Sequence, residues 1–125
     1  MKLLPTCLPL ACCLAFGSAY AHTHLVSSVP AEGATLVSSP TALVLRFSEQ
    51  ARVATATIQR GQEPRQLLRD LPATAAQSST LPLPALAVGA YTVRWRVLGR
   101  DSHVMSGELH FSIVPPNAKL PAPVK

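Results

Sequence analysis

Sulfur is scarce in this sequence and lies almost entirely in its first residues. The chain has 125 residues and three cysteines, Cys7, Cys12 and Cys13, and its two methionines are Met1 and Met105. A product that loses the opening segment therefore has no cysteine for a disulfide, a thiolate metal ligand or a nucleophile. This holds even in a compartment that would permit disulfides.

Acidic and aromatic side chains are also few. Asp and Glu together number 6, and aromatic residues make up 5% of the chain. The carboxylates form no obvious catalytic pair, the serines lie in no recognisable nucleophile elbow, and there is no glycine-rich phosphate loop. The formal net charge is +5, but the basic residues are scattered arginines with little aromatic interleaving. This distribution does not favour a nucleic-acid-binding surface.

The one long apolar run opens the chain and has the three-part form of a secretory signal peptide. Lys2 gives a positive start, residues 3–17 are almost wholly apolar, and the sequence SAYA follows at residues 18–21. The run is shorter than the roughly 20 residues that span a bilayer, and two prolines interrupt it. The cysteines do not stand in the order of a lipoprotein signal, so acylation is not favoured. We expect cleavage after Ala21, a product that begins at His22, and no stable membrane insertion after cleavage.

The rest of the sequence alternates between apolar and polar residues with the period of short strands. The clearest runs place apolar side chains on one face and polar ones on the other, and they are residues 42–47, 89–99 and 107–114. Weaker candidates are residues 24–29, 53–59, 66–71 and 79–83. About a hundred residues suffice for one domain, and seven short strands predict an all-β antiparallel sandwich over residues 22–114. The proline-rich segment 115–125 has little to bury, so we expect an extended or disordered tail there.

Histidine is the remaining candidate for chemistry. His110 falls on the polar face of the final strand, where a solvated surface residue is the simplest interpretation. Asp101 and His103 fall in the sequence GRDSHVMSG between two predicted strands. Residues two apart can project to one side, so both would be offered together at one end of the sandwich. The alternative is a plain turn, in which Asp101 bonds to its own backbone and His103 is merely exposed.

A processed N-terminus would add donors to that pair. As the first residue, His22 would carry an α-amine with an ordinary pKa of about 7.7 to 8. This amine and Nδ1 of the same residue can chelate one metal ion in a six-membered ring. His103 would add a third nitrogen and Asp101 an oxygen. Such a tetragonal set suits Cu(II), whereas Met105 alone offers little to Cu(I).

His24 raises a competing mode of copper binding. A free terminus with histidine at its third position can bind Cu(II) through the amine, two deprotonated amides and the third imidazole. That mode consumes backbone donors that a strand would otherwise use. The alternative is that His24 is a strand residue that only shapes the site, and the sequence leaves the two open.

Several motifs in this order resemble the CopC family of bacterial periplasmic copper-resistance proteins. They are the histidine after the cleavage site, SVPAEG at residues 28–33, FSE at 47–49, GAYTVRW at 89–95 and DSHVMSG at 101–107. The resemblance runs over nearly all of residues 22–114. It implies an immunoglobulin-like Greek-key β-sandwich or barrel that binds one Cu(II) through His22, Asp101 and His103. It also implies that Glu49 does not bind copper itself but orients the amine or an imidazole that does, as such carboxylates commonly do.

Two departures from the family pattern affect the expected site. Some relatives carry a methionine-rich Cu(I) loop, but residues 51–84 of this chain have no methionine, so we do not expect a cuprous site. Arg100 precedes Asp101 where relatives often have Ser or Ala. An ion pair between these two residues would weaken the carboxylate as a donor.

Three functions compete on this basis. The first is a periplasmic copper-binding protein that buffers Cu(II) or passes it to an inner-membrane CopD-type importer. The second is a copper enzyme like the lytic polysaccharide monooxygenases, which also use a terminal-histidine chelate. Those enzymes need an open copper position, which Asp101 would help to fill, so we do not expect an enzyme. The third, an adhesive sandwich without metal, would leave the set of His22, Asp101 and His103 unexplained.

Overall fold

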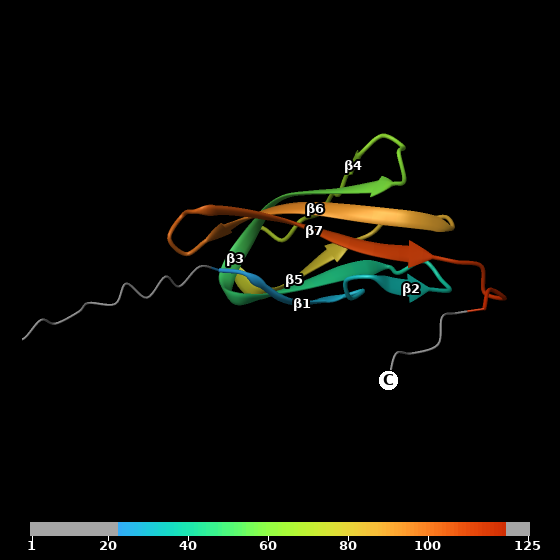
Figure 1. The fold of residues 1–125 in the computed structure, drawn as a ribbon. Helices are drawn as coiled ribbons and strands as arrows, with labels where there is room; N and C mark the ends of the chain where they lie inside the picture. Colours follow the sequence, from blue (N-terminus) through green and yellow to red (C-terminus); the bar gives the residue numbers. More distant parts are fainter. Residues whose placement is uncertain (1–22, 120–125) are drawn as a thin grey trace, which may run out of the picture.

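The computed structural model describes residues 23–119, and these residues form seven β-strands. In chain order the strands are β1 (Leu25–Val29), β2 (Ala34–Leu36), β3 (Ala42–Arg60), β4 (Gln66–Leu67), β5 (Ala76–Pro82), β6 (Gly89–Gly99) and β7 (Val104–Ile113). The same residues contain no helix that is long and apolar enough to cross a membrane. Figure 1 shows the strands stacked in two layers, which confirms the predicted all-β sandwich.

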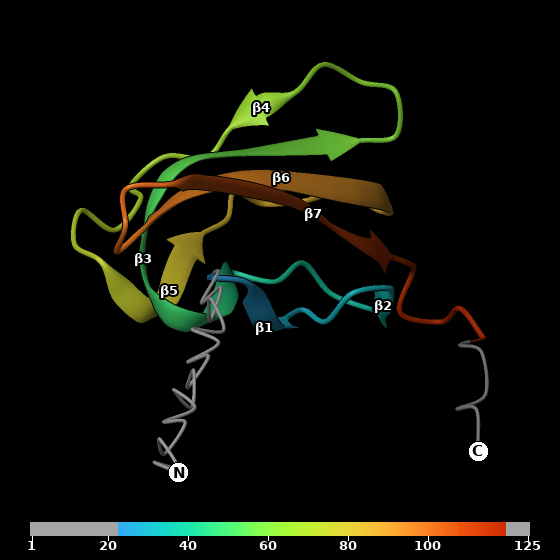
Figure 2. The same cartoon turned by 60° about the vertical axis from the view of Figure 1, so that its left-hand side comes forward.

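The long strand β3 belongs to both layers. Its first half pairs with β1 and β5, and its second half pairs with β4 and β6, so the chain bends from the lower to the upper layer (Figures 1 and 2). The register shifts between Arg46 and Ala51 and between Val53 and Thr55, and such irregularities bend a strand. β7 pairs antiparallel with β6, and β2 pairs parallel with β7. The sheet thus has the order β1-β3-β6-β7-β2.

The observed strands differ from the predicted ones in three places. The predicted strands 42–47 and 53–59 are one continuous element, and the register shift between Arg46 and Ala51 marks where it passes from one set of partners to the other. The predicted strand 66–71 is only Gln66–Leu67, paired with β3. The strand β2 was not predicted, since three residues are too few to show an alternation.

The core lies between the layers and is built from the faces that the alternation predicts. Leu43, Leu45 and Phe47 of β3 are fully buried, as are Val93 and Val97 of β6. From β7 the core receives Leu109, Phe111 and Ile113. The Phe47 and Trp95 rings meet edge to face, with centroids 5.5 Å apart. This contact ties β6 to the first half of β3 across the core.

Gly107 of the DSHVMSG motif makes room for the indole of Trp95. The two residues face each other across β6 and β7, and a Cβ built at Gly107 would lie only 2.8 Å from Cε2 of Trp95. Any larger residue would push the indole out of its place in the core. The glycine of this motif is therefore a packing requirement of the sandwich.

The SVPAEG motif forms a turn that is tied to β7. The Val29–Pro30 peptide bond is cis, and Gly33 has a φ of 74°, as a glycine in such a turn can adopt. The Gly33 N–H donates to the His110 carbonyl at 2.7 Å. In return, the Glu32 carboxylate accepts hydrogen bonds from the backbone N–H and the Nδ1 of His110, both at 2.8 Å. His110 is thus at the surface, as predicted, but it is held by a partner.

The predicted domain ends lie mostly outside the described residues. The signal segment 1–21 and His22 precede them, and residues 120–125 follow them. After β7, the Ala118 N–H donates to the Pro115 carbonyl at 2.9 Å in a turn. The extended tail therefore stays a prediction.

Candidate metal centre

The turn between β6 and β7 carries Asp101 and His103, as the sequence predicted. It is closed by two backbone hydrogen bonds, from the Gly99 N–H to the His103 carbonyl at 3.0 Å and from the Ser102 N–H to the Gly99 carbonyl at 3.1 Å. Ser102 has a φ of 64°, a left-handed conformation that few non-glycine residues adopt. The turn is therefore a tight backbone structure that holds residues 101 and 103 on one side.

The Asp101 carboxylate binds His103 in two ways. Its Oδ2 lies 2.7 Å from His103 Nδ1, and its Oδ1 accepts the His103 backbone N–H at 3.2 Å. The backbone hydrogen bond is the main reason why the pKa of Asp101 is lower than its usual value, and the imidazole adds to this effect. Both features of the plain-turn alternative are present, because Asp101 bonds to the local backbone and His103 is exposed, and the bond from Asp101 to the His103 ring is additional. When Nδ1 carries the proton shared with Asp101, Nε2 is left as the nitrogen that can bind a metal.

The start of the described chain lies against this turn. Thr23 is only 4% exposed. A Cβ built at Gly99 would lie 3.0 Å from Thr23 Oγ1 and 3.1 Å from Asp101 Oδ1. Thr23 and Asp101 therefore both approach the position that a side chain at Gly99 would fill. The N-terminal segment and the Asp101–His103 turn meet at one end of the sandwich.

The next residue of the chain is held by Ser48 of β3. The His24 N–H donates to Ser48 Oγ at 3.0 Å, and the Ser48 N–H donates to the His24 carbonyl at 2.9 Å. These bonds extend the β1–β3 pairing, in which Leu25 faces Phe47. Sequence reasoning noted Ser48 only as part of the FSE motif and missed this role.

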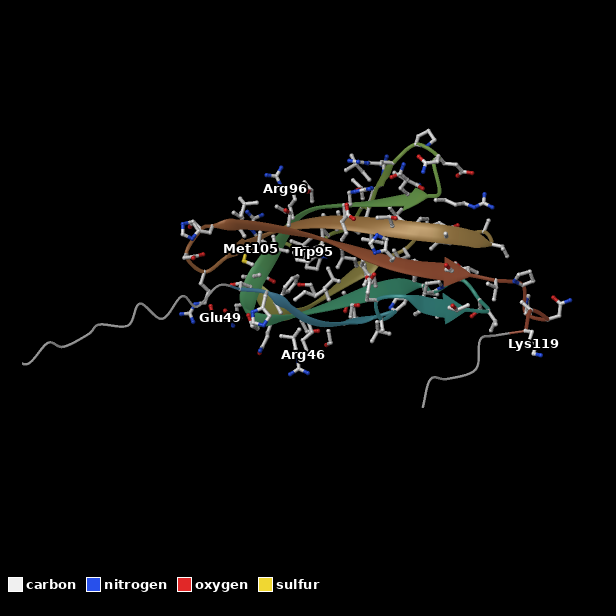
Figure 3. The ribbon with its side chains drawn as sticks, viewed as in Figure 1. Arg46, Glu49, Trp95, Arg96, Met105 and Lys119 are labelled. Atoms are coloured by element: carbon white, nitrogen blue, oxygen red, sulfur yellow. The ribbon has the colours of Figure 1, made fainter. Side chains whose placement is uncertain are left out.

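Two further sequence hypotheses concern charged neighbours of the turn. Glu49 lies at the end of the sandwich where β1 begins (Figure 3), and the residue two places on, Ala51, pairs with Gly99. Its carboxylate bonds to no residue within 23–119, so its orienting role stays a prediction. Arg100 forms no ion pair with Asp101 in the described part of the chain, and the Asp101 oxygens are turned toward His103 instead.

The described residues do not complete a metal site by themselves. Among residues 23–119, no three His, Asp or Glu side chains gather where they could hold one ion. Asp101 and His103 supply a pair of donors. The predicted third ligand, His22, lies outside the described residues, directly before Thr23.

Comparison with known proteins identifies the family. The CopC domain matches residues 25–114. The chain belongs to the CopC family. Copper resistance protein C of Xanthomonas campestris pv. juglandis is 34% identical over 118 residues, which cover 86% of this chain and 92% of the relative. Protein YobA of Escherichia coli K12 is 31% identical over 101 residues, which cover 77% of this chain and 82% of the relative.

Solved structures agree with this assignment. CopC from Methylosinus trichosporium OB3b superposes with a TM-score of 0.67 at 29% identity, over 79% of this chain and 99% of the relative. PcoC, a methionine-rich copper resistance protein from Escherichia coli, superposes with a TM-score of 0.58 at 25% identity, over 75% of this chain and all of the relative. CopC-family proteins are copper-binding resistance proteins and not enzymes. The enzymatic alternative drawn from the terminal histidine therefore gives way to copper binding.

Proposed function

We propose that this CopC-family protein binds one Cu(II) ion in the periplasm and buffers it or passes it to a CopD-type importer in the inner membrane. Signal cleavage after Ala21 would free the amine of His22. The ligands would be that amine, the His22 imidazole, His103 Nε2 and an oxygen of Asp101. Because an ion on Nε2 lies on the far side of the ring from Nδ1, Asp101 would have to release Nδ1 to reach the same ion. The observation that carries this proposal is the meeting of Thr23 and Asp101 over Gly99.

The position of Thr23 supports His22 as a ligand. Consecutive Cα atoms are about 3.8 Å apart. The residue bonded to Thr23 is therefore only one residue away from a side chain that approaches the Asp101–His103 turn. Thr23 is buried, which limits how far this attachment point can move. A terminal chelate would then start close to this pair, and the half-exposed Asp101 side chain would turn from His103 Nδ1 to complete the site.

The Asp101–His103 pair supports a preorganised imidazole ligand. Both side chains are largely exposed, at 51% and 74%, so a metal ion can reach them from solvent. The hydrogen bond at Nδ1 holds the ring and directs its other nitrogen outward, as carboxylates do for metal-bound histidines. The lowered pKa of Asp101 keeps the carboxylate ionised, which is the form that accepts from His103 and donates to a metal.

Ser48 argues against the tripeptide mode in the folded protein. That mode requires the His24 amide to lose its proton and turn to the metal. In the structure this amide donates to Ser48 Oγ. The mode would therefore cost this hydrogen bond and disturb the adjoining one from Ser48 to the His24 carbonyl. We propose His24 as a strand residue beside the site.

The donor set supports Cu(II) over Cu(I). The cysteines all precede the proposed cleavage site, which leaves Met105 as the one sulfur of the product. Met105 is partly buried and packs against the core, close to where β7 leaves the turn (Figure 3). Nitrogen and oxygen donors favour the oxidised ion.

The decisive experiment compares a protein that begins at His22 with one that retains Ala21. The added residue turns the amine into an amide but leaves every side chain in place. We expect the first form to bind one Cu(II) with a nitrogen-rich tetragonal EPR spectrum, and the extended form to bind at least tenfold more weakly. Equal thermal stability of the two metal-free forms is the control. Equal copper affinity would refute the terminal chelate.

A second comparison tests the histidines separately. Replacement of His103 by alanine should remove one nitrogen from the EPR spectrum, whereas replacement of His24 by alanine should leave the spectrum unchanged. Loss of the signal in the His24 variant would instead favour the tripeptide mode. Transfer to an importer is tested by copper uptake in cells that contain or lack a CopD-type protein, with and without this chain.

A further inference from the structure

The fold gathers arginines that are scattered in the sequence. A groove of about 320 Å³ lies on the outer face of the upper layer. The residues that line it include Thr55 and Thr57 of β3, Arg65 before β4, Arg94 and Arg96 of β6, and Glu108 of β7. We call this groove the arginine trough. The pairing of Thr55 with Arg96 and of Thr57 with Arg94 places the hydroxyls beside the guanidinium groups.

The trough has positive charge that is not balanced within it. Arg94 is already engaged, because it donates to Glu108 at 2.8 Å and to Gln59 at 2.9 Å. Arg65 and Arg96 are exposed and form no ion pair within residues 23–119. The trough thus has three arginines and one carboxylate, Glu108, which already forms an ion pair with Arg94.

The positive surface continues past the trough toward β4. A second hollow shares Thr55 and Arg65 with the trough and is also lined by Arg69. The two hollows adjoin at Thr55 and Arg65, and their lining residues come from strands β3, β4, β6 and β7. Figure 3 shows Arg96 projecting outward from the upper layer, away from Trp95 in the core, while Arg46 projects from the opposite layer.

We infer that the arginine trough is a docking surface for an acidic segment of a partner protein. Guanidinium forks bind carboxylates through two parallel hydrogen bonds, and strands hold them at fixed spacing. The Thr55 and Thr57 hydroxyls can bond to the backbone of an extended segment.

The arginine trough is close to the Asp101–His103 turn, but the two share no residue. Arg96 precedes Gly99 by three residues on β6, which corresponds to about 10 Å along a strand. A partner held in the trough would therefore lie beside the turn. The docking itself needs no copper, so its success or failure is separate from that of the proposed copper site.

The test uses a fluorescein-labelled octaglutamate peptide and the secreted protein, with fluorescence anisotropy as the readout. We expect binding at low ionic strength that weakens toward physiological salt, where the screening length is about 8 Å. The variant Arg65→Glu/Arg96→Glu should bind about tenfold more weakly, since two attractions become repulsions. Metal-free and copper-loaded protein should give the same result.

The matched control is Arg46→Glu/Lys119→Glu, which changes the net charge equally at sites away from the trough (Figure 3). We expect less than a twofold loss for this control, and unchanged thermal unfolding for both variants. An equal loss in the two variants would show a net-charge effect and overturn the inference. Displacement of the peptide by inorganic phosphate at equal charge concentration would also overturn the inference. So would binding to phosphatidylglycerol vesicles that is lost in the Arg65→Glu/Arg96→Glu variant but is not reduced by octaglutamate.

Discussion

Replacement of Gly99 by alanine tests whether the position of Thr23 affects copper binding at the Asp101–His103 turn. Gly99 contributes no ligand and no hydrogen-bonding side chain. Its importance lies in the space that it leaves between Thr23 and Asp101. The substitution adds a single methyl group there, so any effect on copper must come from the placement of its two neighbours.

The size of the effect follows from the distances. The new Cβ would lie 3.0 Å from Thr23 Oγ1 and 3.1 Å from Asp101 Oδ1, so each neighbour must yield by a few tenths of an ångström. The Asp101 side chain is half exposed and can turn away, but this would strain its bonds to His103. Thr23 is buried and can yield only by shifting the chain start. Disturbed orienting contacts commonly cost a metal site about tenfold to hundredfold in affinity, and we expect a loss at the lower end.

Stability should change little in the same variant. Gly99 does not adopt a left-handed φ, so alanine fits its backbone conformation. The loss of glycine flexibility in the unfolded chain stabilises by about 0.4 to 1 kcal/mol. Crowding against Thr23 and Asp101 acts in the opposite direction, so we expect a net change below about 1 kcal/mol.

The assay is a competition titration with a copper chelator, together with thermal unfolding of the metal-free protein. Gly33→Ala is the control, because Gly33 has a φ of 74° and no heavy atom near its missing Cβ. That variant should lose about 1 kcal/mol or more of stability and keep its copper affinity. If Gly99→Ala binds copper within twofold of the unmodified protein, Thr23 and Asp101 are not coupled as argued.

Three other predictions concern Ser48, pH and Glu32. Ser48→Ala removes the acceptor of the His24 amide, so it should lower the free energy of unfolding by about 0.5 to 1.5 kcal/mol. It should also allow copper binding through the His24 amide, seen as an added EPR signal that remains when His103 is replaced as well. An EPR spectrum that does not change in Ser48→Ala contradicts this. The Asp101 pKa is lowered, so its carboxylate stays ionised below the usual Asp range, and the histidines, which bind metal only when deprotonated, should set the acid limit of copper binding; affinity unchanged down to about pH 4 would exclude histidine ligands. The Glu32 pKa is lowered mainly by the His110 backbone N–H, so this contact stabilises the fold above the usual Glu pKa and is lost as pH falls through the lowered one. Glu32→Gln should therefore cost about 0.5 to 1 kcal/mol at pH 7 and progressively less as the pH falls through the lowered pKa of Glu32, measured by thermal unfolding.

The alternation of residues predicted the faces of the strands because burial in a sandwich follows side-chain direction. Val93, Val97 and Phe47 are buried as expected, and Arg96 points into solvent. Alternation says nothing about where one strand bends into a second layer. For this reason the sequence predicts two strands where the structure has the single strand β3. The strand β2 is not predicted because its three residues are too few to show an alternation.

The Asp101–His103 turn was predictable because its two residues are close in sequence. Asp101 and His103 are bounded by strong strand patterns on both sides, so their meeting needs no knowledge of distant pairing. The contributions of Thr23 and Ser48 depend on the register of β1 against β3 and on the approach of β1 to β6. The arginine trough was hidden for the same reason, since Arg65 and Arg96 meet only through strand pairing over some thirty residues.

If His22 is the terminal ligand, the fold and the protease divide the work of building the site. The described fold already holds Asp101 against His103 and places Thr23 beside them, without any metal. In the uncut chain the amine of His22 is tied up in the peptide bond to Ala21. Cleavage would then create the tight site only after export, so the precursor would bind Cu(II) weakly inside the cell. Ser48 would complete this arrangement, since it holds the His24 amide and so keeps the new terminus from closing on copper by itself.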